Sequence, residues 1–285
     1  MDLCSVNDIR ALLSRHGFRF SKALGQNFLT EPWVPERIAG ESGADSSCGV
    51  LEIGPGVGCL TKELSLAAGK VVAVELDKRL PALLSESLAG CDNVEIISGD
   101  ILALDLPALV REKFAGLTPM VCANLPYNIT SPVLSALIDS RAFETITVMV
   151  QREVARRIAS TAESGDYGAF SVYVNYHAEP EILFDVSPDC FMPQPKVWSS
   201  VIRLKMRKAP PAEISDEAFF FRVVRAAFAQ RRKTLVNALA ASFTTLPKSD
   251  IQDAVAECGF SPMVRGEALD IAGFASLSRA IKQRI

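Results

Sequence analysis

Short apolar runs alternate with segments of helical periodicity over the first 205 residues. Runs such as GVLEIG and KVVAVEL are typical of buried strands, and each is followed by a segment in which apolar side chains recur every three or four positions. Strands and helices in this order predict a parallel sheet with crossover helices, which is a doubly wound α/β fold. Two later segments, FSVYVNYHAEPEILFDV and SSVIRLKM, predict an antiparallel edge on the same sheet.

The remainder of the chain has a helical pattern after RKAPPAEIS, which is typical of a linker. DEAFFFRVVRAAFAQRRKTLVNALAASF predicts one long amphipathic helix with Ser215 or Asp216 as its N-cap. SDIQDAVAECG predicts a second helix, because Ser249 and Gln252 have capping-box spacing and Gly259 ends the run. GFASLSRAIKQR predicts a third.

These patterns predict two domains. Residues 1–207, with an N-terminal extension over 1–30, form a Rossmann-like domain, and residues 208–285 form a small, all-helical domain. Hydrophobic residues make up 49% of the chain, which excludes global disorder, and no apolar run is long enough to span a membrane.

Cysteines and charge narrow the class of protein. Seven scattered cysteines without a CxxC pair, and only two histidines, predict reduced thiols in the cytoplasm with no metal site. The first residues have no apolar signal core, and Asp2 and Asp8 argue against a transit peptide. The window from Cys190 to Lys233 has a net charge of +7, whereas the rest of the chain has −10. This asymmetry predicts a basic binding face on an acidic body.

The segment LEIGPGVGCLT places Gly54, Gly56 and Gly58 between a strand and a helix, where the backbone can approach a ligand closely. Glu75 ends the next strand, where its carboxylate can accept both hydroxyls of a ribose. Asp100 ends the third, where it can accept from an adenine amino group. A dinucleotide fingerprint requires its third glycine at Cys59, so the pattern favours an adenosine without a pyrophosphate, such as S-adenosylmethionine.

The segment VCANLPYNIT ends the fourth strand in Asn124, beside the predicted cofactor. The exocyclic nitrogen of adenine is a poor nucleophile, because its lone pair is delocalised into the ring. Acceptors on its two N–H bonds, supplied by the Asn124 side chain and by the carbonyl of Leu125 or Pro126, stabilise the tetrahedral nitrogen of the transition state. Tyr127 offers a π-face for the base.

NLPY resembles the Asn/Asp-Pro-Pro-Tyr-type motif of nucleic-acid amino-methyltransferases. The chain as a whole resembles the KsgA/RsmA family of small-subunit ribosomal RNA adenine dimethyltransferases. The likeness runs nearly end to end, through the segments ALGQNFL (Ala23 to Leu29), LEIGPGVGCLT, AVELD, GDIL, NLPYNITSPVL, MVQREVARRI, YGAFSV, FMPQPKVWSSVIRL and AAFAQRRKTLVNAL. It implies a Rossmann-like methyltransferase domain dependent on S-adenosylmethionine, followed by a helical RNA-binding domain.

The resemblance also implies roles for individual residues. The implied cofactor-binding residues are Asn27, Leu29, Gly54, Gly56, Glu75, Asp100 and Asn124. The implied catalytic segment is Asn124, Leu125, Pro126 and Tyr127, with the Phe191 loop facing Tyr127 so that the target base lies between two rings. The residues expected to contact RNA phosphates are Lys196, Arg231, Arg232 and Lys233. Trp198 departs from the family, in which this position is often polar.

The implied substrate is a pair of adjacent adenosines in the 3′-terminal hairpin loop of 16S rRNA, within the small ribosomal subunit or its precursor. Each adenosine receives two methyl groups, and we expect a cytoplasmic monomer with a role in subunit biogenesis. Three alternatives stay open: a large-subunit adenine methyltransferase of the antibiotic-resistance type, a non-catalytic assembly factor, and a nicotinamide enzyme, against which Cys59 argues.

Overall fold

The computed structural model describes residues 1–18, 20, 25–162 and 164–285, so Ala23 and Leu24 of the ALGQNFL segment lie outside the described residues. The chain divides into two compact units. The first comprises Met1–Ala155 and Glu181–Met206, and the second comprises Arg156–Pro180 and Arg207–Ile285. The second unit thus includes an internal segment, whereas the predicted domains are divided by one cut after residue 207. That domain division stays a prediction.

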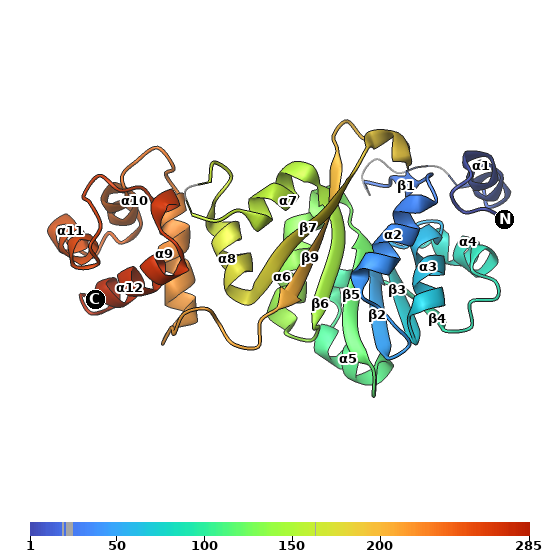
Figure 1. Cartoon of the computed structure of the whole chain (residues 1–285), viewed down its shortest axis with the longest axis horizontal. Coiled ribbons are helices and arrows are strands. Elements are labelled where there is room, and N and C mark those ends of the chain that lie inside the picture. Colours follow the sequence, from blue (N-terminus) through green and yellow to red (C-terminus); the bar gives the residue numbers. More distant parts are fainter. Residues whose placement is uncertain (19, 21–24, 163) are drawn as a thin grey trace. The chain divides into compact units, whose positions relative to one another are not determined.

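Seven strands form one sheet in the order β4-β3-β2-β5-β6-β9-β7 (Figure 1). Their bounds are β2 (Cys48–Ile53), β3 (Lys70–Glu75), β4 (Val94–Ser98), β5 (Thr118–Asn124), β6 (Thr145–Gln151), β7 (Ala178–Val186) and β9 (Ser199–Met206). Strands β2 to β6 pair in parallel, and β9 pairs antiparallel with β6. The predicted doubly wound, mostly parallel sheet and its antiparallel addition are confirmed.

Helices of the first unit cover both faces of this sheet. They are α2 (Trp33–Ser42), α3 (Cys59–Ala67), α4 (Leu80–Ser87), α5 (Leu106–Lys113) and α6 (Thr130–Ser140), and α7 (Arg152–Ala159) follows β6 across the boundary of the units. Helix α1 (Val6–Arg15) lies beside α4 (Figure 1), where Arg15 donates to Glu86 at 2.5 Å. Right-handed crossovers place α3 and α4 on one face and α5 and α6 on the other, because the strand order reverses after β4. All six residues of β2 are buried, as its continuous apolar run predicts.

The segment predicted to be β-rich from Phe170 onward begins instead as a helix. Helix α8 (Ala169–His177) precedes β7, so only the second half of the predicted segment is a strand. The hydroxyl of Ser171 accepts from the Gly168 N–H at 3.1 Å and donates to the Arg157 carbonyl oxygen, which anchors the first turn. Capping and packing thus override the β propensity of the aromatic and β-branched residues.

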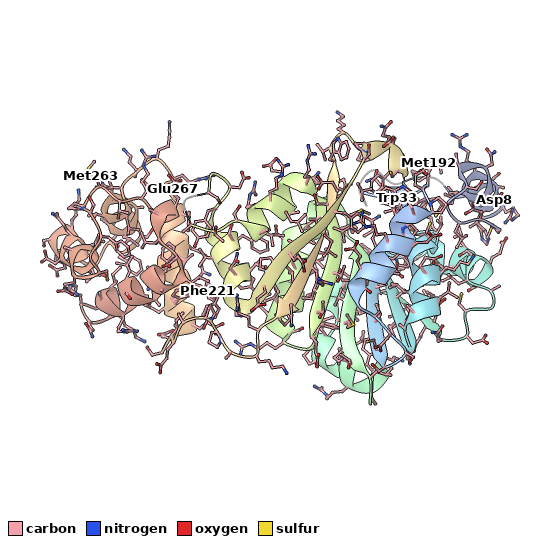
Figure 2. The ribbon with its side chains drawn as sticks, in the orientation of Figure 1. Asp8, Trp33, Met192, Phe221, Met263 and Glu267 are labelled. Carbon is pink, nitrogen blue, oxygen red and sulfur yellow. The ribbon has the colours of Figure 1, made fainter. Side chains whose placement is uncertain are left out.

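The second unit is helical, and it contains α8 and four later helices. These are α9 (Glu217–Phe228), α10 (Leu235–Ser242), α11 (Lys248–Glu257) and α12 (Ile271–Lys282). Between them lies an aromatic core that includes Phe220, Phe243 and Phe274, and the neighbouring Phe221 of α9 is labelled in Figure 2. Asp216 caps α9, as predicted, because its carboxylate accepts from the Phe219 N–H at 3.0 Å.

Two predictions about these helices are wrong. The long helix is interrupted after Phe228, because Thr234 caps a new helix by accepting from the Asn237 N–H at 3.4 Å, and the Leu235 N–H bonds to the Val264 carbonyl oxygen. The capping box at Ser249 does not form, because α11 already begins at Lys248. None of the described helices has the length and apolar character needed to cross a bilayer.

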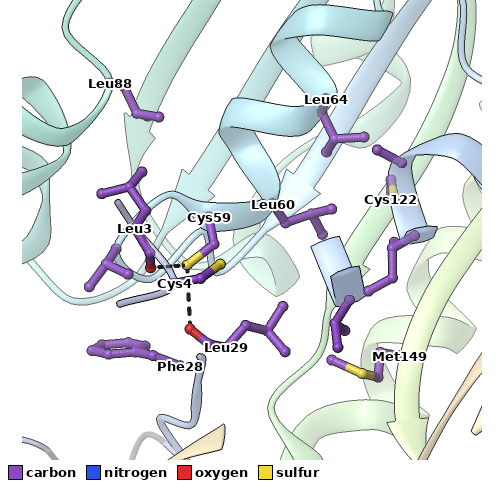
Figure 3. Packing of buried hydrophobic residues seen from close by; sticks show 14 of the residues in the cluster. Leu3, Cys4, Phe28, Leu29, Cys59, Leu60, Leu64, Leu88, Cys122 and Met149 are labelled. Carbon is purple, nitrogen blue, oxygen red and sulfur yellow. Dashed lines mark hydrogen bonds between the residues drawn. The ribbon is translucent and has the colours of Figure 1, made fainter. Parts of the chain in front are cut away.

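The core of the first unit ties the N-terminal extension to the glycine loop. The thiol of Cys59 donates to the carbonyl oxygens of Leu3 at 2.9 Å and Leu29 at 3.7 Å (Figure 3). A separate two-stranded sheet pairs β1 (Phe28–Leu29) with β8 (Phe191–Met192), and Leu29 lies opposite Phe191. These contacts hold the start of α3 and the chain before α2 in fixed positions.

Candidate active site

A cavity of about 230 Å³ lies at the carboxyl ends of β2, β3, β4 and β5. The strand order reverses between β2 and β5, which is the place where doubly wound sheets bind ligands. Ten of the predicted site residues line it: Asn27, Leu29, Gly54, Gly56, Glu75, Asp100, Asn124, Leu125, Pro126 and Tyr127. The structure therefore brings together the residues predicted for the cofactor and those predicted for the acceptor.

The glycine loop forms one wall of the cavity. Gly56 has a φ of 62°, and an added Cβ atom would lie 3.0 Å from the Phe28 ring. A side chain at this position would be strained by the backbone and crowded by the ring. Gly54 has a φ of 68° and its N–H bonds to the Val74 carbonyl oxygen at 2.9 Å, so the loop is fastened to the neighbouring strand.

Two carboxylates lie at the ends of the next two strands. Glu75 is buried, and its Oε1 atom accepts from the Asp77 N–H at 2.7 Å, while burial raises the pKa of the carboxyl group. Asp100 is exposed and caps a short 3₁₀ turn, because its Oδ1 atom accepts from the Leu102 N–H at 2.9 Å. Asp100 is thus both a local cap and part of the cavity wall.

The Asn-Leu-Pro-Tyr segment is held by contacts on both sides. Asn124 ends β5, and its Nδ2 atom donates to the Asn27 carbonyl oxygen at 3.3 Å. The Leu125 N–H bonds to the Met149 carbonyl oxygen at 3.1 Å, which joins the segment to β6. The Pro126 carbonyl oxygen accepts from the Ile129 N–H at 3.2 Å and from the Thr130 hydroxyl at 3.3 Å.

The ring of Tyr127 is anchored by its hydroxyl group. That hydroxyl and the Ser199 hydroxyl share a hydrogen bond of 2.7 Å, and burial raises the pKa of Tyr127. Ser199 is fully buried at the start of β9. The sequence offers no periodic signal for this contact, because Ser199 and Tyr127 meet only when β9 pairs with β6.

Phe191 does not line the cavity. Its ring is only 4% exposed, lies in the hydrophobic core of the first unit and belongs to the strand paired with β1. Its proposed stacking role stays a prediction. Lys196 is exposed in the loop that follows β8.

The predicted basic cluster belongs to the second unit. Arg231, Arg232 and Lys233 are exposed in the turn between α9 and α10. Arg231 donates to the Gly165 carbonyl oxygen at 2.9 Å. The break in the predicted long helix therefore presents three cationic side chains on one turn.

The sequence motifs assign no role to Glu52 and do not single out Gln26 or Asp77, which also belong to this region. Glu52 lines the cavity with only 1% exposure, and burial, with the charge of Glu75, raises its pKa to about 8. Its Oε2 atom has no hydrogen-bond partner among the described residues. Gln26 donates to Asp77 at 2.9 Å, and hydrogen bonds from Arg79 lower the pKa of Asp77 to about 2.

This fold, with its cavity at the switch point and an acceptor segment on the neighbouring strand end, defines a methyltransferase of the Rossmann-like class. The chain belongs to the ribosomal RNA adenine dimethylase family, whose model matches residues 17–259. It is therefore an rRNA adenine dimethyltransferase, as the motifs predict.

Two curated relatives are named ribosomal RNA small subunit methyltransferase A. The protein of Geobacillus thermodenitrificans (strain NG80-2) is 44% identical over 98% of this chain and 97% of its own length. That of Lachnoclostridium phytofermentans (strain ATCC 700394 / DSM 18823 / ISDg) is 45% identical over 96% of both chains.

Two solved structures share the fold. The crystal structure of the 23S rRNA methyltransferase ErmE is similar with a TM-score of 0.69 and 27% identity, over 90% of this chain and 100% of that one. A dimethyladenosine transferase from Plasmodium falciparum has a TM-score of 0.75 at 24% identity, over 90% and 98% of the two chains.

Proposed function

We propose that the protein transfers methyl groups from S-adenosylmethionine to N6 of two adjacent adenosines in the 3′-terminal hairpin loop of 16S rRNA, giving N6,N6-dimethyladenosine. The observation that carries this proposal is the position of Asn124, whose side chain lines the same cavity as Glu75 and Asp100. The small-subunit target is supported by relatives of that name at 44–45% identity over nearly the whole chain.

The cavity fits S-adenosylmethionine in its polar groups. Glu75 can accept the ribose hydroxyls, and Asp100 can accept from the adenine amino group through the oxygen that does not cap the turn. The Oε2 atom of buried Glu52 has no hydrogen-bond partner among the described residues, so the carboxyl group of Glu52 can form a hydrogen bond with a polar group of the bound cofactor. When bound, the cofactor supplies an electrophilic methyl group on a sulfonium.

The chain activates the adenine nitrogen by accepting its protons. We assign one acceptor to Asn124 Oδ1 and the other to the Leu125 carbonyl oxygen, because the Pro126 carbonyl already accepts two hydrogen bonds. These contacts strengthen as the nitrogen becomes tetrahedral and positive, so they lower the barrier. The displaced proton can leave to water, and a singly methylated base still offers one N–H for the second transfer.

Recognition of the RNA is assigned to one residue of the cavity wall and to four cationic residues outside the cavity. Tyr127 offers its anchored ring to the base, and Lys196, Arg231, Arg232 and Lys233 are proposed to contact phosphates. We further propose a cytoplasmic monomer that acts on the small subunit or its precursor during biogenesis, with residues 208–285 serving RNA binding.

The test uses radiolabelled S-adenosylmethionine and small subunits that lack the modification, followed by nucleoside analysis. We expect labelled N6,N6-dimethyladenosine in 16S rRNA. Label in 23S rRNA alone, when large subunits are offered in parallel, would move the target to the large subunit. Cofactor binding with no label in either RNA would leave a non-catalytic assembly factor.

A further inference from the structure

Trp198 lies exposed at the end of the loop that joins β8 to β9. Its side chain is 42% exposed, although a large aromatic ring is favoured inside a protein. Neighbouring Val197 is also exposed, at 43%, and Lys196 precedes it. The first unit therefore presents an apolar ring and a cation on one short loop.

The Trp198 ring is held in position by Arg152, the first residue of α7. The Arg152 N–H bonds to the Trp198 carbonyl oxygen at 2.9 Å, and the guanidinium carbon lies 5.2 Å from the centroid of the indole. Asp185 lies 3.8 Å from the same guanidinium and steadies it. A cation over an indole is an attractive pair, so Arg152 favours this position of the ring.

This pair lies beside the predicted base-binding residues. Trp198 directly precedes Ser199, whose hydroxyl bonds to the Tyr127 hydroxyl at 2.7 Å. In the sheet, Ser199 lies opposite Gln151, and Asn124 lies opposite Met149 on the same strand. The exposed indole, Tyr127 and Asn124 are thus gathered at one end of three adjacent strands.

We propose that Trp198 and Arg152 form a stacking subsite for the nucleobase adjacent to the target adenosine. The inference rests on the proposed function. A base that enters the site leaves its stack, so its neighbour in the RNA loses a stacking partner. An exposed ring next to a guanidinium replaces that partner, because every base has a π-face and aromatic stacking tolerates sequence. Lys196, two residues away, is in reach of the backbone phosphates.

The first test compares methylation of unmodified small subunits by wild type, Trp198→Ala and Trp198→Phe. We expect Trp198→Ala to raise KM by roughly 5- to 150-fold, the equivalent of one lost base stack, with kcat changed by less than about threefold. Trp198→Phe retains a ring and should stay within about threefold of wild type. Thermal unfolding of each variant checks that it folds.

Trp33 offers a matched control. It is 41% exposed and packs on the Phe184 ring, with 6.1 Å between centroids (Figure 2 labels Trp33). We expect Trp33→Ala to leave KM unchanged. A KM for Trp198→Ala equal to that of wild type, or an equal rise for Trp33→Ala, would overturn the subsite.

The second test identifies the occupant. A synthetic RNA hairpin with two adjacent adenosines in its loop is compared with hairpins that carry one abasic site, placed at either adenosine of the pair or at the nucleotide on either side of it. We expect the abasic site next to the target adenosine and Trp198→Ala to weaken binding without adding to each other, since both remove one stack. Additive losses would mean that Trp198 contacts another part of the RNA, and would overturn the subsite. If wild type methylates small subunits while the losses add, only the subsite fails. If the wild-type protein does not methylate small subunits, the proposed function is wrong, and the subsite that rests on it is wrong as well.

Discussion

The side chain of Asn124 donates a hydrogen bond to the backbone carbonyl oxygen of Asn27, with 3.3 Å between Nδ2 and O. This bond joins the end of β5 to the segment just before β1. Because the amide nitrogen is committed to Asn27, the Oδ1 atom is left as the acceptor of this side chain. The chain at Asn27 thus orients the Oδ1 atom of Asn124, which we propose accepts a hydrogen bond from the adenine amino group.

Asn124→Ala should lower the rate of methyl transfer by at least about 100-fold, because it removes a contact that strengthens in the transition state. Affinity for small subunits should change little. Single-turnover transfer and subunit binding, measured separately, check the two statements. Asn7→Ala, at an exposed position of α1, serves as the control. Transfer at the wild-type rate would exclude Asn124 from catalysis.

The hydroxyl and the ring of Tyr127 should have separable effects. Tyr127→Phe and Ser199→Ala each remove the bond between the two hydroxyls, so each should reduce kcat/KM by only about 2- to 10-fold. Tyr127→Ala also removes the π-face and should reduce it much further. Steady-state kinetics of the three variants measure kcat/KM. An equal loss of kcat/KM in Tyr127→Phe and Tyr127→Ala would contradict a stacking role for the Tyr127 ring.

Glu75→Gln should weaken binding of S-adenosylmethionine by roughly 10- to 100-fold, because charged acceptors make the stronger hydrogen bonds. Isothermal titration calorimetry measures the dissociation constant. Glu95→Gln is matched to it, since Glu95 lies on neighbouring β4 and pairs with Lys113 instead of lining the cavity. An unchanged dissociation constant for Glu75→Gln would remove this carboxylate from the cofactor site.

Glu52 should make the free protein less stable as the pH rises. Burial raises its pKa from about 4.5 to about 8, so between these values the folded state keeps a proton that the unfolded chain has lost. The free energy of unfolding therefore falls across this window, by up to about 5 kcal/mol. Glu52→Gln should lack this decline. Urea unfolding at pH 5 and pH 8.5 measures the free energy of unfolding of wild type and of Glu52→Gln. An equal change in this free energy between the two pH values in both proteins would contradict the prediction.

Neutralising Arg231, Arg232 and Lys233 with glutamine should weaken RNA binding and flatten its salt dependence. Each phosphate contact to a single strand contributes about 0.7 to the slope of log K against log salt, so the slope should fall by up to about 2. The triple change of Arg10, Lys62 and Arg111, all exposed in the first unit, is the control with equal charge. A slope equal to that of wild type would place the cluster outside the interface.

Much of the fold was predictable because its signals are local. The apolar run of β2 predicts the strand, and the glycines after it predict the end of the strand and the loop. The helix break at Thr234 was missed because apolar periodicity continues through it, and the stop depends on a bond from Leu235 to Val264 in a distant turn. The start of α8 was misread because aromatic and β-branched residues suit both a strand and a buried helix.

The site was predictable only where residues end strands or carry a motif. Glu75, Asp100 and Asn124 follow from their places at strand ends. Ser199 and the bond from Asn124 to Asn27 could not be found, since they join segments that meet only in the folded sheet. Glu52 lies within a strand, and only its burial in the wall of the cavity shows that it belongs to the candidate site.

The pairing of β1 with β8 joins the wall of the cavity to the loop that we propose contacts RNA, although the two segments lie far apart in the sequence. Leu29 lines the cavity, and Phe191 begins the strand that leads into the loop with Lys196 and Trp198. A change of length or shape in either segment disturbs the backbone ladder that both share. An insertion or deletion in the loop proposed to face RNA should therefore also disturb the cavity wall at Leu29.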